Sequence, residues 1–202
     1  MKAVPPLAAV VLAAGDSQRM GRPKALLRTP AGTFLERAVA LAGAAQMAPV
    51  RIVVGRAAAA IAEAHPHLAH SCVVNPTPEL GQLHSLRLAL ASLPEGVEGA
   101  AVFLVDHPSV RPETVSKLAR VWRQHPAAIV VPVHEARRGH PVIFPRTVWD
   151  ELHRVPLEAG ARAVVLADER RLMAVPVDDP GVVADIDTPE EYRQLLESRH
   201  DH

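Results

Sequence analysis

The sequence has few of the residue types that mark secreted, membrane-spanning or nucleic-acid-binding chains. Cys72 is the only cysteine, which excludes an intrachain disulfide and favours a reducing compartment. Lysine and arginine number 22 and so do aspartate and glutamate, so no basic excess is available to bind a phosphate backbone. Aromatic residues make up 3% of the chain, which leaves few rings for stacking on bases. We therefore expect no nucleic-acid partner.

Long apolar segments are also absent. No apolar run approaches the ~20 residues that a membrane-spanning helix needs. Residues 1–6 contain one lysine and two prolines and lack the long apolar stretch and small-residue cleavage site of a signal peptide. These features predict a cytoplasmic protein without a membrane partner, and we expect it to be a monomer.

Apolar residues make up 49% of the 202 residues, enough for the core of one α/β domain. Strands are predicted at 7–12, 50–54, 71–74, 100–105 and 127–133, and helices at 33–46, 57–64, 83–93, from 111 onward, and from 188 to about 197. This alternation predicts a mostly parallel central sheet with helices on both faces. Extended segments at 142–144 and 172–177 predict a mixed region beside that sheet, and residues 199–202 are expected to fray.

The first predicted strand runs directly into a loop that is typical of phosphate binding. Residues 12–24 read Leu-Ala-Ala-Gly-Asp-Ser-Gln-Arg-Met-Gly-Arg-Pro-Lys. Gly15 and Gly21 allow the backbone to approach an anion closely, and Arg19 and Lys24 add positive charge. Five residues separate the two glycines, and Lys24 comes three residues after the second, so the spacing excludes a Walker loop. A plain tight turn would not need arginine and lysine at fixed offsets.

Two acidic segments suggest a metal site. Asp106 directly follows the predicted strand 100–105, at the strand end where open α/β sheets bind ligands, although it could instead cap the turn before Pro108. Asp185 and Asp187 flank one apolar residue, so in an extended segment their side chains share a face. Asp187 or Thr188 could alternatively cap the last helix. Carboxylates of this kind suit Mg²⁺, which also binds substrate phosphates.

Three further segments carry polar groups with open interpretations. Asn75, Gly81, Gln82 and Ser85 lie around a predicted helix start, where they could contact a base, a ribose or a phosphate, although Ser85 could simply be a polar helix position. Residues 137–142 could bind a phosphate or form a solvated basic turn. The histidines of residues 65–70 do not have zinc-ligand spacing and predict a solvated helix end, and Cys72 is expected to be a small buried apolar residue.

Taken in order, these segments resemble the signatures of the MobA-like nucleotidyltransferases. Residues 12–24 resemble Leu-Ala-Ala-Gly-x-Ser-x-Arg-Met-Gly-x-x-Lys, residues 75–86 resemble Asn-x(5)-Gly-x(3)-Ser-Leu, residues 139–141 match Gly-His-Pro, and residues 185–191 resemble Asp-Ile-Asp-Thr-Pro-Glu-Asp. The resemblance covers residues 10–192. It implies that residues 1–202 form one domain with a Rossmann-like three-layer nucleotidyltransferase fold. In this fold a part from about residue 7 to 110 binds the nucleotide and a part from about residue 111 to 198 binds the acceptor.

The resemblance also implies a reaction and a set of site residues. A phosphate oxygen of molybdopterin or molybdenum cofactor would attack the α-phosphorus of a nucleoside triphosphate, and pyrophosphate would leave. The implied catalytic residues are Arg19, Lys24, Asp106 and Asp187. Asp106 and Asp187 would hold Mg²⁺, or Mn²⁺, with Asp185 as a weaker candidate ligand. The implied nucleotide-binding residues are Leu12, Ala13, Ala14, Gly15, Ser17, Arg19, Gly21, Lys24, Asn75, Gly81, Gln82 and Ser85. The implied acceptor-binding residues are Arg138, Gly139, His140, Gly160 and Arg162.

The base and the acceptor depend on smaller features. Family members with Leu-Ala-Ala-Gly tend to use CTP and those with Leu-Ala-Gly-Gly tend to use GTP, so Ala14 favours CTP and a cytidylyltransferase-like activity. Leu157-Glu158 replaces the Gly-Asp pair that often precedes the family's Gly-Ala-Arg, which leaves a different acceptor, such as a sugar phosphate, as an alternative. A third possibility is an escort that binds the finished cofactor and delivers it to a client molybdoenzyme.

Overall fold

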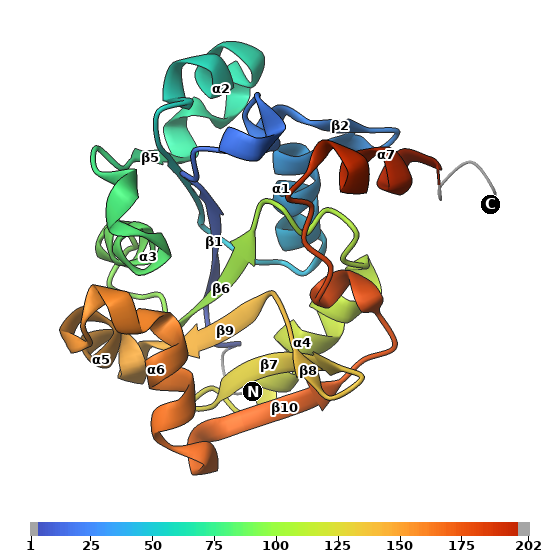
Figure 1. Ribbon diagram of the computed structural model, residues 1–202. Coiled ribbons are helices and arrows are strands. Elements are labelled where there is room, and N and C mark those ends of the chain that lie inside the picture. The colour runs from blue at the N-terminus through green and yellow to red at the C-terminus, as the bar shows by residue number, and fades with distance from the viewer. Residues whose placement is uncertain (1–3, 198–202) are drawn as a thin grey trace.

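A computed structural model describes residues 4–197, in which helices and strands alternate along most of the chain (Figure 1). The strands are β1 (Leu7–Ala13), β2 (Arg28–Thr29), β3 (Gly32–Thr33), β4 (Val50–Val54), β5 (Cys72–Val74), β6 (Gly99–Leu104), β7 (Ile129–His134), β8 (Arg137–Arg138), β9 (Val142–Pro145) and β10 (Leu172–Pro176). The α-helices are α1 (Phe34–Ala44), α2 (Ala58–Ala64), α3 (Gln82–Ala91), α4 (Pro112–Gln124), α5 (Trp149–Arg154), α6 (Gly160–Ala167) and α7 (Pro189–Glu197). The predicted fraying of residues 199–202 lies outside the described residues.

One mixed sheet forms the centre of the molecule. Within residues 4–197 its strand order is β10-β7-β9-β6-β1-β4-β5, and β8 pairs with β7 outside this path. β1 pairs in parallel with β4 and β6, and β10 pairs in parallel with β7, which confirms the predicted mostly parallel sheet. β9 runs antiparallel to both β6 and β7.

The position of β9 differs from the prediction. Residues 142–144 and 172–177 were expected beside the main sheet, but β9 lies inside it and β10 forms its edge. All four β9 residues are buried, and Ile143 faces one core while Val142 and Phe144 face the other. Because both faces of β9 carry apolar side chains, the strand is stable only where helices cover both faces of the sheet.

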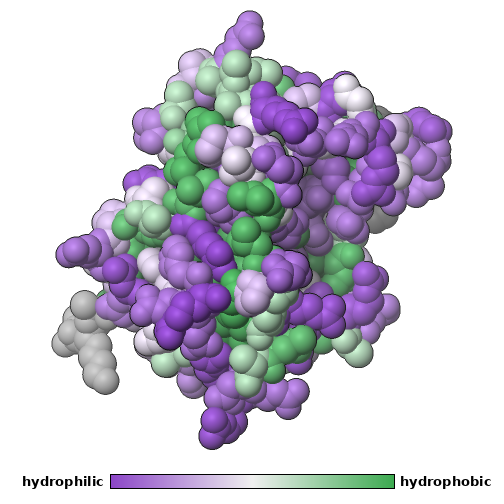
Figure 2. All heavy atoms as spheres, turned by 60° about the vertical axis from the view of Figure 1, so that its left-hand side comes forward, coloured by the Kyte–Doolittle hydropathy of each residue, from purple (hydrophilic) through white to green (hydrophobic). Residues whose placement is uncertain are grey.

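Helices cover the sheet on both faces, which gives three layers (Figure 1). Helices α1, α2, α4 and α7 contribute buried residues to one core, and α3, α5 and α6 contribute to the other. Along β1, Val11 belongs to the first core and Val10 to the second, as the alternation of side chains on a strand requires. Figure 2 turns the side of α3, α5 and α6 toward the viewer and shows apolar side chains in a band between polar ones.

Two expectations about residues 65–72 hold only in part. His65 is only 4% exposed, so it is not a solvated helix end, although His67 and His70 are exposed. The Nε2 atom of His65 lies 3.2 Å from the hydroxyl of Thr33, the residue that caps α1. The His65 ring therefore connects the end of α2 to the start of α1. Cys72 is half-buried rather than buried, its thiol donates to the Leu68 carbonyl at 3.5 Å, and burial raises the pKa of that thiol.

The carboxyl ends of the adjacent strands β1 and β6 point to the same edge of the sheet. The loop of residues 14–24 leaves β1 there, and Asp106 follows β6. Open α/β sheets bind ligands at this edge. In residues 4–197 no helix has both the length and the apolar character needed to cross a membrane.

Candidate active site

The loop that follows β1 is held in shape by its own backbone and by Ser17. Ser17 and Gly21 both adopt left-handed backbone conformations, with φ of 49° and 67°. The Ser17 carbonyl accepts a hydrogen bond from Met20 N at 2.9 Å, and the Ser17 hydroxyl accepts one from Lys24 N at 3.1 Å. Ser17 thereby ties the first half of the loop to Lys24, which fixes where the lysine side chain starts.

Four charged side chains meet at the base of this loop. Lys24 Nζ lies 3.0 Å from an Asp106 carboxylate oxygen and also donates to Asp187, and Arg19 donates to the other Asp187 oxygen. Burial lowers the pKa of Lys24, but the hydrogen bond to Asp187 and the charge of Asp106 outweigh that effect and leave the pKa raised. The hydrogen bonds from Lys24 and the charges of Lys24 and Arg19 lower the pKa of Asp187. Lys24 and Asp187 are therefore both ionised at neutral pH.

Backbone hydrogen bonds hold the two aspartate segments together. Ile186 N donates to the Asp106 carbonyl at 2.9 Å, although the two residues are far apart in the sequence. The Thr188 hydroxyl accepts from Glu191 N at 3.3 Å, so Thr188 caps α7 and the Asp187 carboxylate is left for the ion cluster. Asp185 is exposed and is not among the residues that line the cavity beside this cluster, whereas Asp106 and Asp187 are.

A cavity of about 580 Å³ opens over the loop and the ion cluster. Its lining contains most of the predicted nucleotide-binding residues, namely Leu12, Ala13, Ala14, Gly15, Ser17, Arg19, Lys24, Gly81, Gln82 and Ser85. The two predicted metal ligands, Asp106 and Asp187, line it as well. Gly21 lies on the other side of the loop and lines a separate hollow. Asn75 is buried behind the cavity wall, where its amide donates to the Ser85 hydroxyl at 2.9 Å and its oxygen accepts from Thr77 N at 2.9 Å. The structure thus places Asn75 as a support for Ser85.

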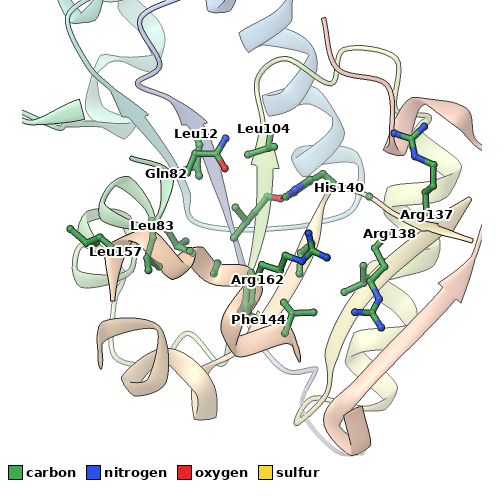
Figure 3. A pocket seen from close by; sticks show the side chains of 18 of the residues that line it. Leu12, Gln82, Leu83, Leu104, Arg137, Arg138, His140, Phe144, Leu157 and Arg162 are labelled. Atoms are coloured by element: carbon green, nitrogen blue, oxygen red, sulfur yellow. The ribbon is translucent and has the colours of Figure 1, made fainter. Parts of the chain in front are cut away.

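A second cavity, of about 770 Å³, adjoins the first. All five predicted acceptor residues line it: Arg138, Gly139, His140, Gly160 and Arg162. Figure 3 shows Arg162 reaching into this space from α6, with Arg137 and Arg138 on the opposite side. Leu12, Gln82 and Leu104 line both cavities, so the two spaces meet at the carboxyl ends of β1 and β6.

Several residues that line the second cavity were not assigned a role from the sequence, among them Arg137 and Leu157. Arg137 lines it beside Arg138, and the only signal for it was its place in the same basic turn. Leu157 lines it too, at the position where the chain departs from the family signature. Both halves of the chain contribute to both cavities, since Leu12 lines the second cavity and Asp187 lines the first.

His140 lies half-buried in the wall of the second cavity. Burial and the nearby charge of His107 lower its pKa to about 4. The two imidazole rings are 5.5 Å apart, and His140 Nδ1 lies 3.5 Å from the Val102 carbonyl. The His140 imidazole is therefore neutral at physiological pH and can serve as a hydrogen-bonding group rather than as a charge.

Gly139 marks a close approach between the second cavity and the segment that leads to Asp187. His140 N donates to the Val182 carbonyl at 2.8 Å, and a Cβ on Gly139 would lie 2.1 Å from that same oxygen. We expect Gly139→Ala to lower stability by about 1–3 kcal/mol, because the hairpin must move away from Val182. This corresponds to a fall in Tm of several degrees in a calorimetric scan.

Gly96→Ala is the matched control, because a Cβ at Gly96 would have no atom within 4 Å. Its Tm should stay within about one degree of the wild type. Equal Tm values for the two variants would contradict the close approach at Gly139.

The donor set fits a divalent cation that completes its coordination with substrate. Within residues 4–197 no group of three His, Cys, Asp or Glu side chains could hold a metal ion by itself. Asp106 and Asp187 nevertheless converge on one cation, the Lys24 ammonium. Two carboxylates with further oxygens from substrate phosphates are a set that Mg²⁺ or Mn²⁺ accepts.

Comparison with known proteins agrees with this geometry. The chain matches the MobA-like NTP transferase domain over residues 9–186. A probable molybdenum cofactor guanylyltransferase from Mycobacterium tuberculosis strain H37Rv is 38% identical over 130 residues, which are 63% of this chain and 62% of that relative. One from Rhodopirellula baltica is 32% identical over 184 residues, 86% of this chain and 85% of that protein. A molybdenum cofactor cytidylyltransferase from Escherichia coli K12 is 23% identical over 185 residues, 91% and 92% of the two chains.

A solved structure extends the match to the full fold. The crystal structure of Rv0371c from Mycobacterium tuberculosis H37Rv in complex with manganese is 33% identical to this chain, with a TM-score of 0.77 over 96% of this chain and 99% of that one. The family match covers most of the 202 residues, including the loop after β1 and the first cavity's Asp106. The protein therefore belongs to the MobA-like NTP transferase family.

Proposed function

We propose that the protein transfers a nucleotidyl group from a nucleoside triphosphate, with CTP as the first choice, to the terminal phosphate of molybdopterin or molybdenum cofactor. The observation that carries this proposal is the meeting of two cavities at Leu12, Gln82 and Leu104, with the cluster of Lys24 and the two carboxylates lining one of them. A reaction that joins two phosphorylated molecules needs two binding spaces that share a border. The molybdenum cofactor relatives, named for guanylyl or cytidylyl transfer, support the choice of acceptor.

On the nucleotide side, the chain would bind and neutralise the triphosphate. Gly15 and Ser17 bring loop backbone N–H groups to the phosphates, and Arg19 and Lys24 supply positive charge. Asp106 and Asp187 would hold Mg²⁺ or Mn²⁺, which when bound neutralises charge at the α-phosphate and at the attacking oxygen. Lys24 would then exchange its carboxylate partners for phosphate oxygens.

The transfer itself needs no nucleophile from the protein. An oxygen of the acceptor phosphate forms a bond to the α-phosphorus, the bond from that phosphorus to the bridging oxygen breaks, and pyrophosphate leaves with the electron pair. Positioning of the two substrates and stabilisation of the developing negative charge carry the catalysis. Arg19 and Lys24 are the cations available to the departing pyrophosphate.

On the acceptor side, charged groups and an apolar wall would orient a phosphorylated ring system. Arg138 and Arg162 face the second cavity and would bind the acceptor phosphate, and neutral His140 would donate or accept a hydrogen bond. Leu83 and Phe144 supply apolar surface on the same cavity wall. We place this reaction in the cytoplasm and expect a molybdoenzyme to receive the product.

CTP and GTP are the two candidates for the nucleoside triphosphate that the protein uses. Ala14 lines the nucleotide cavity and is 6% exposed, and its methyl group favours CTP by resemblance to the Leu-Ala-Ala-Gly members of the family. GTP is the second candidate, because the guanylyltransferase relatives are 38% and 32% identical and the cytidylyltransferase relative is 23% identical. We expect Ala14→Gly to lower the ratio of kcat/KM for CTP to kcat/KM for GTP by about tenfold. Steady-state kinetics with each triphosphate measures this ratio.

The test of the acceptor uses purified protein with Mg²⁺, CTP and molybdenum cofactor, and mass spectrometry of the product. Formation of the cytosine dinucleotide of the cofactor is the expected result. Product with GTP alone would reverse the base assignment. Leu157 in the acceptor cavity keeps a sugar phosphate as the alternative acceptor, and turnover of a sugar phosphate without any cofactor dinucleotide would contradict the proposal.

A cofactor escort without catalysis is the alternative from another class. An escort needs the acceptor cavity but has no use for Lys24 between a pair of convergent carboxylates. The ion cluster therefore favours an enzyme. Delivery of cofactor to a molybdoenzyme by a protein that never releases pyrophosphate would support the escort instead.

A further inference from the structure

Glu191 makes two backbone hydrogen bonds directly beside the ion cluster. One of its carboxylate oxygens, Oε2, accepts from Asp187 N at 2.7 Å and from Thr188 N at 2.8 Å. Glu191 lies in the first turn of α7, is half-buried, and does not line the nucleotide cavity. Any influence on that cavity therefore passes through the residues that it holds.

These bonds fix the backbone of Asp187 from both sides. Ile186 N donates to the Asp106 carbonyl at 2.9 Å, and the next two N–H groups, of Asp187 and Thr188, donate to Glu191. Three consecutive backbone N–H groups are thus bound, one to the segment that carries Asp106 and two to α7. A backbone held in this way leaves the Asp187 side chain little freedom except rotation about its own χ angles.

The bond to Asp187 goes beyond what capping of a helix requires. In a capping box the acidic side chain accepts from the backbone N–H of the capping residue itself. Helix α1 shows that ordinary pattern, in which Glu36 accepts from Thr33 N at 2.7 Å and from the Thr33 hydroxyl. In α7 the Oε2 atom of Glu191 accepts from the capping residue, Thr188, and also from Asp187 N, one residue before the cap.

We propose that Glu191 is a positioning residue for metal binding, and that its carboxylate holds the Asp187 backbone so that the Asp187 side chain faces Asp106 and Lys24. This inference rests on the proposed function of Asp187. Removal of a residue that hydrogen-bonds to a metal ligand without touching the metal commonly lowers metal affinity by about 10–100-fold. Loss of Glu191 should therefore weaken metal binding without removing any group that touches the metal.

The test is a titration with Mn²⁺ alone, in which electron paramagnetic resonance measures the free ion. Glu191→Ala is expected to raise the Kd for Mn²⁺ by about tenfold. Glu191→Gln keeps an oxygen acceptor and should recover most of the affinity. Glu191→Met keeps the side-chain length without an acceptor, and it replaces the alanine variant if that variant does not fold.

Two controls separate positioning from helix stability. Thr188→Ala removes the hydroxyl that caps α7 but leaves both backbone bonds to Glu191, so it should lower Tm and leave the Kd for Mn²⁺ unchanged. Glu190→Ala changes the neighbouring exposed glutamate, which pairs with Arg193, and should leave both quantities unchanged. An equal loss of Mn²⁺ affinity in the Thr188 and Glu191 variants would overturn the positioning role.

Asp187→Ala distinguishes this inference from the proposed function. If Asp187→Ala loses Mn²⁺ binding and the Glu191 variants bind like the wild type, the positioning role is wrong and the metal site stands. If Asp187→Ala itself binds Mn²⁺ like the wild type, the metal site and the inference that rests on it both fail.

Discussion

Asp187→Ala is expected to lower kcat for nucleotidyl transfer by about a hundredfold or more, and Asp185→Ala is expected to change it by less than about twofold. Asp187 pairs with Lys24 and Arg19 inside the nucleotide cavity, whereas Asp185 is exposed and does not line that cavity. Removing the Asp187 carboxylate would leave Asp106 alone to hold the divalent cation. Pyrophosphate release under saturating substrate gives the two rates directly.

The two aspartates make a matched pair, because they lie two residues apart in one segment. If Asp185→Ala lost the rate of pyrophosphate release and Asp187→Ala kept it, the second metal ligand would be Asp185. Circular dichroism of both variants should match that of the wild type, since neither side chain belongs to the apolar cores.

Lys24→Met has the second large expected effect: it should lower kcat and raise the affinity for Mn²⁺. The variant should lose about a hundredfold or more in kcat, because the phosphates lose a cation. In the absence of nucleotide it should bind Mn²⁺ at least about tenfold more tightly, because Lys24 no longer occupies the space between Asp106 and Asp187. Single-turnover kinetics and a Mn²⁺ titration measure the two effects.

Arg19→Met is the comparison variant for that titration. Arg19 pairs with Asp187 only, and its side chain is 69% exposed, so its removal should change Mn²⁺ affinity less than removal of Lys24. Unchanged or weaker Mn²⁺ binding by Lys24→Met would mean that the two carboxylates do not form one metal site.

A short segment connects the walls of the two cavities. The Val182 carbonyl accepts from His140 N in the wall of the second cavity, and four residues later Ile186 N donates to the Asp106 carbonyl. Gly139 permits the first of these approaches, because any side chain there would meet Val182. Residues 182–187 thus hold the loop around Gly139 and the two carboxylates in a fixed relation, as the proposed transfer between the two cavities would require.

The sequence predicted those parts of the molecule that depend on local spacing. The loop of residues 12–24 and the placement of Asp106 after a strand follow from neighbouring residues, and the structure brings both to one cavity. The position of β9 was not predicted, because an apolar run of four residues does not state which strands it pairs with. Its antiparallel place depends on pairing with two separate strands: Ile143 pairs with Ala101 of β6, 42 positions earlier, and with Val130 of β7, 13 positions earlier.

Buried polar residues were harder to place from sequence, since their partners come from distant elements. His65 followed a helical pattern and was expected to be solvated, but Thr33 gives it a buried partner. Asn75 was predicted to contact the nucleotide; in the structure it is buried and makes hydrogen bonds with Ser85 and Thr77. Glu191 was visible as an acidic residue in a first helical turn, but its bond to Asp187 depends on the path of the chain before the helix.

If a nucleotidyl group passes from one cavity to the other, as we propose, the α-phosphate of the triphosphate must reach the acceptor, and radioactive labels follow it. The protein would be incubated with Mg²⁺, molybdenum cofactor and CTP or GTP labelled with ³²P at either the α- or the γ-phosphate. We expect the α-label to appear in the cofactor and the γ-label to appear in pyrophosphate. The γ-label in the cofactor, or the α-label in free nucleoside monophosphate alone, would contradict it.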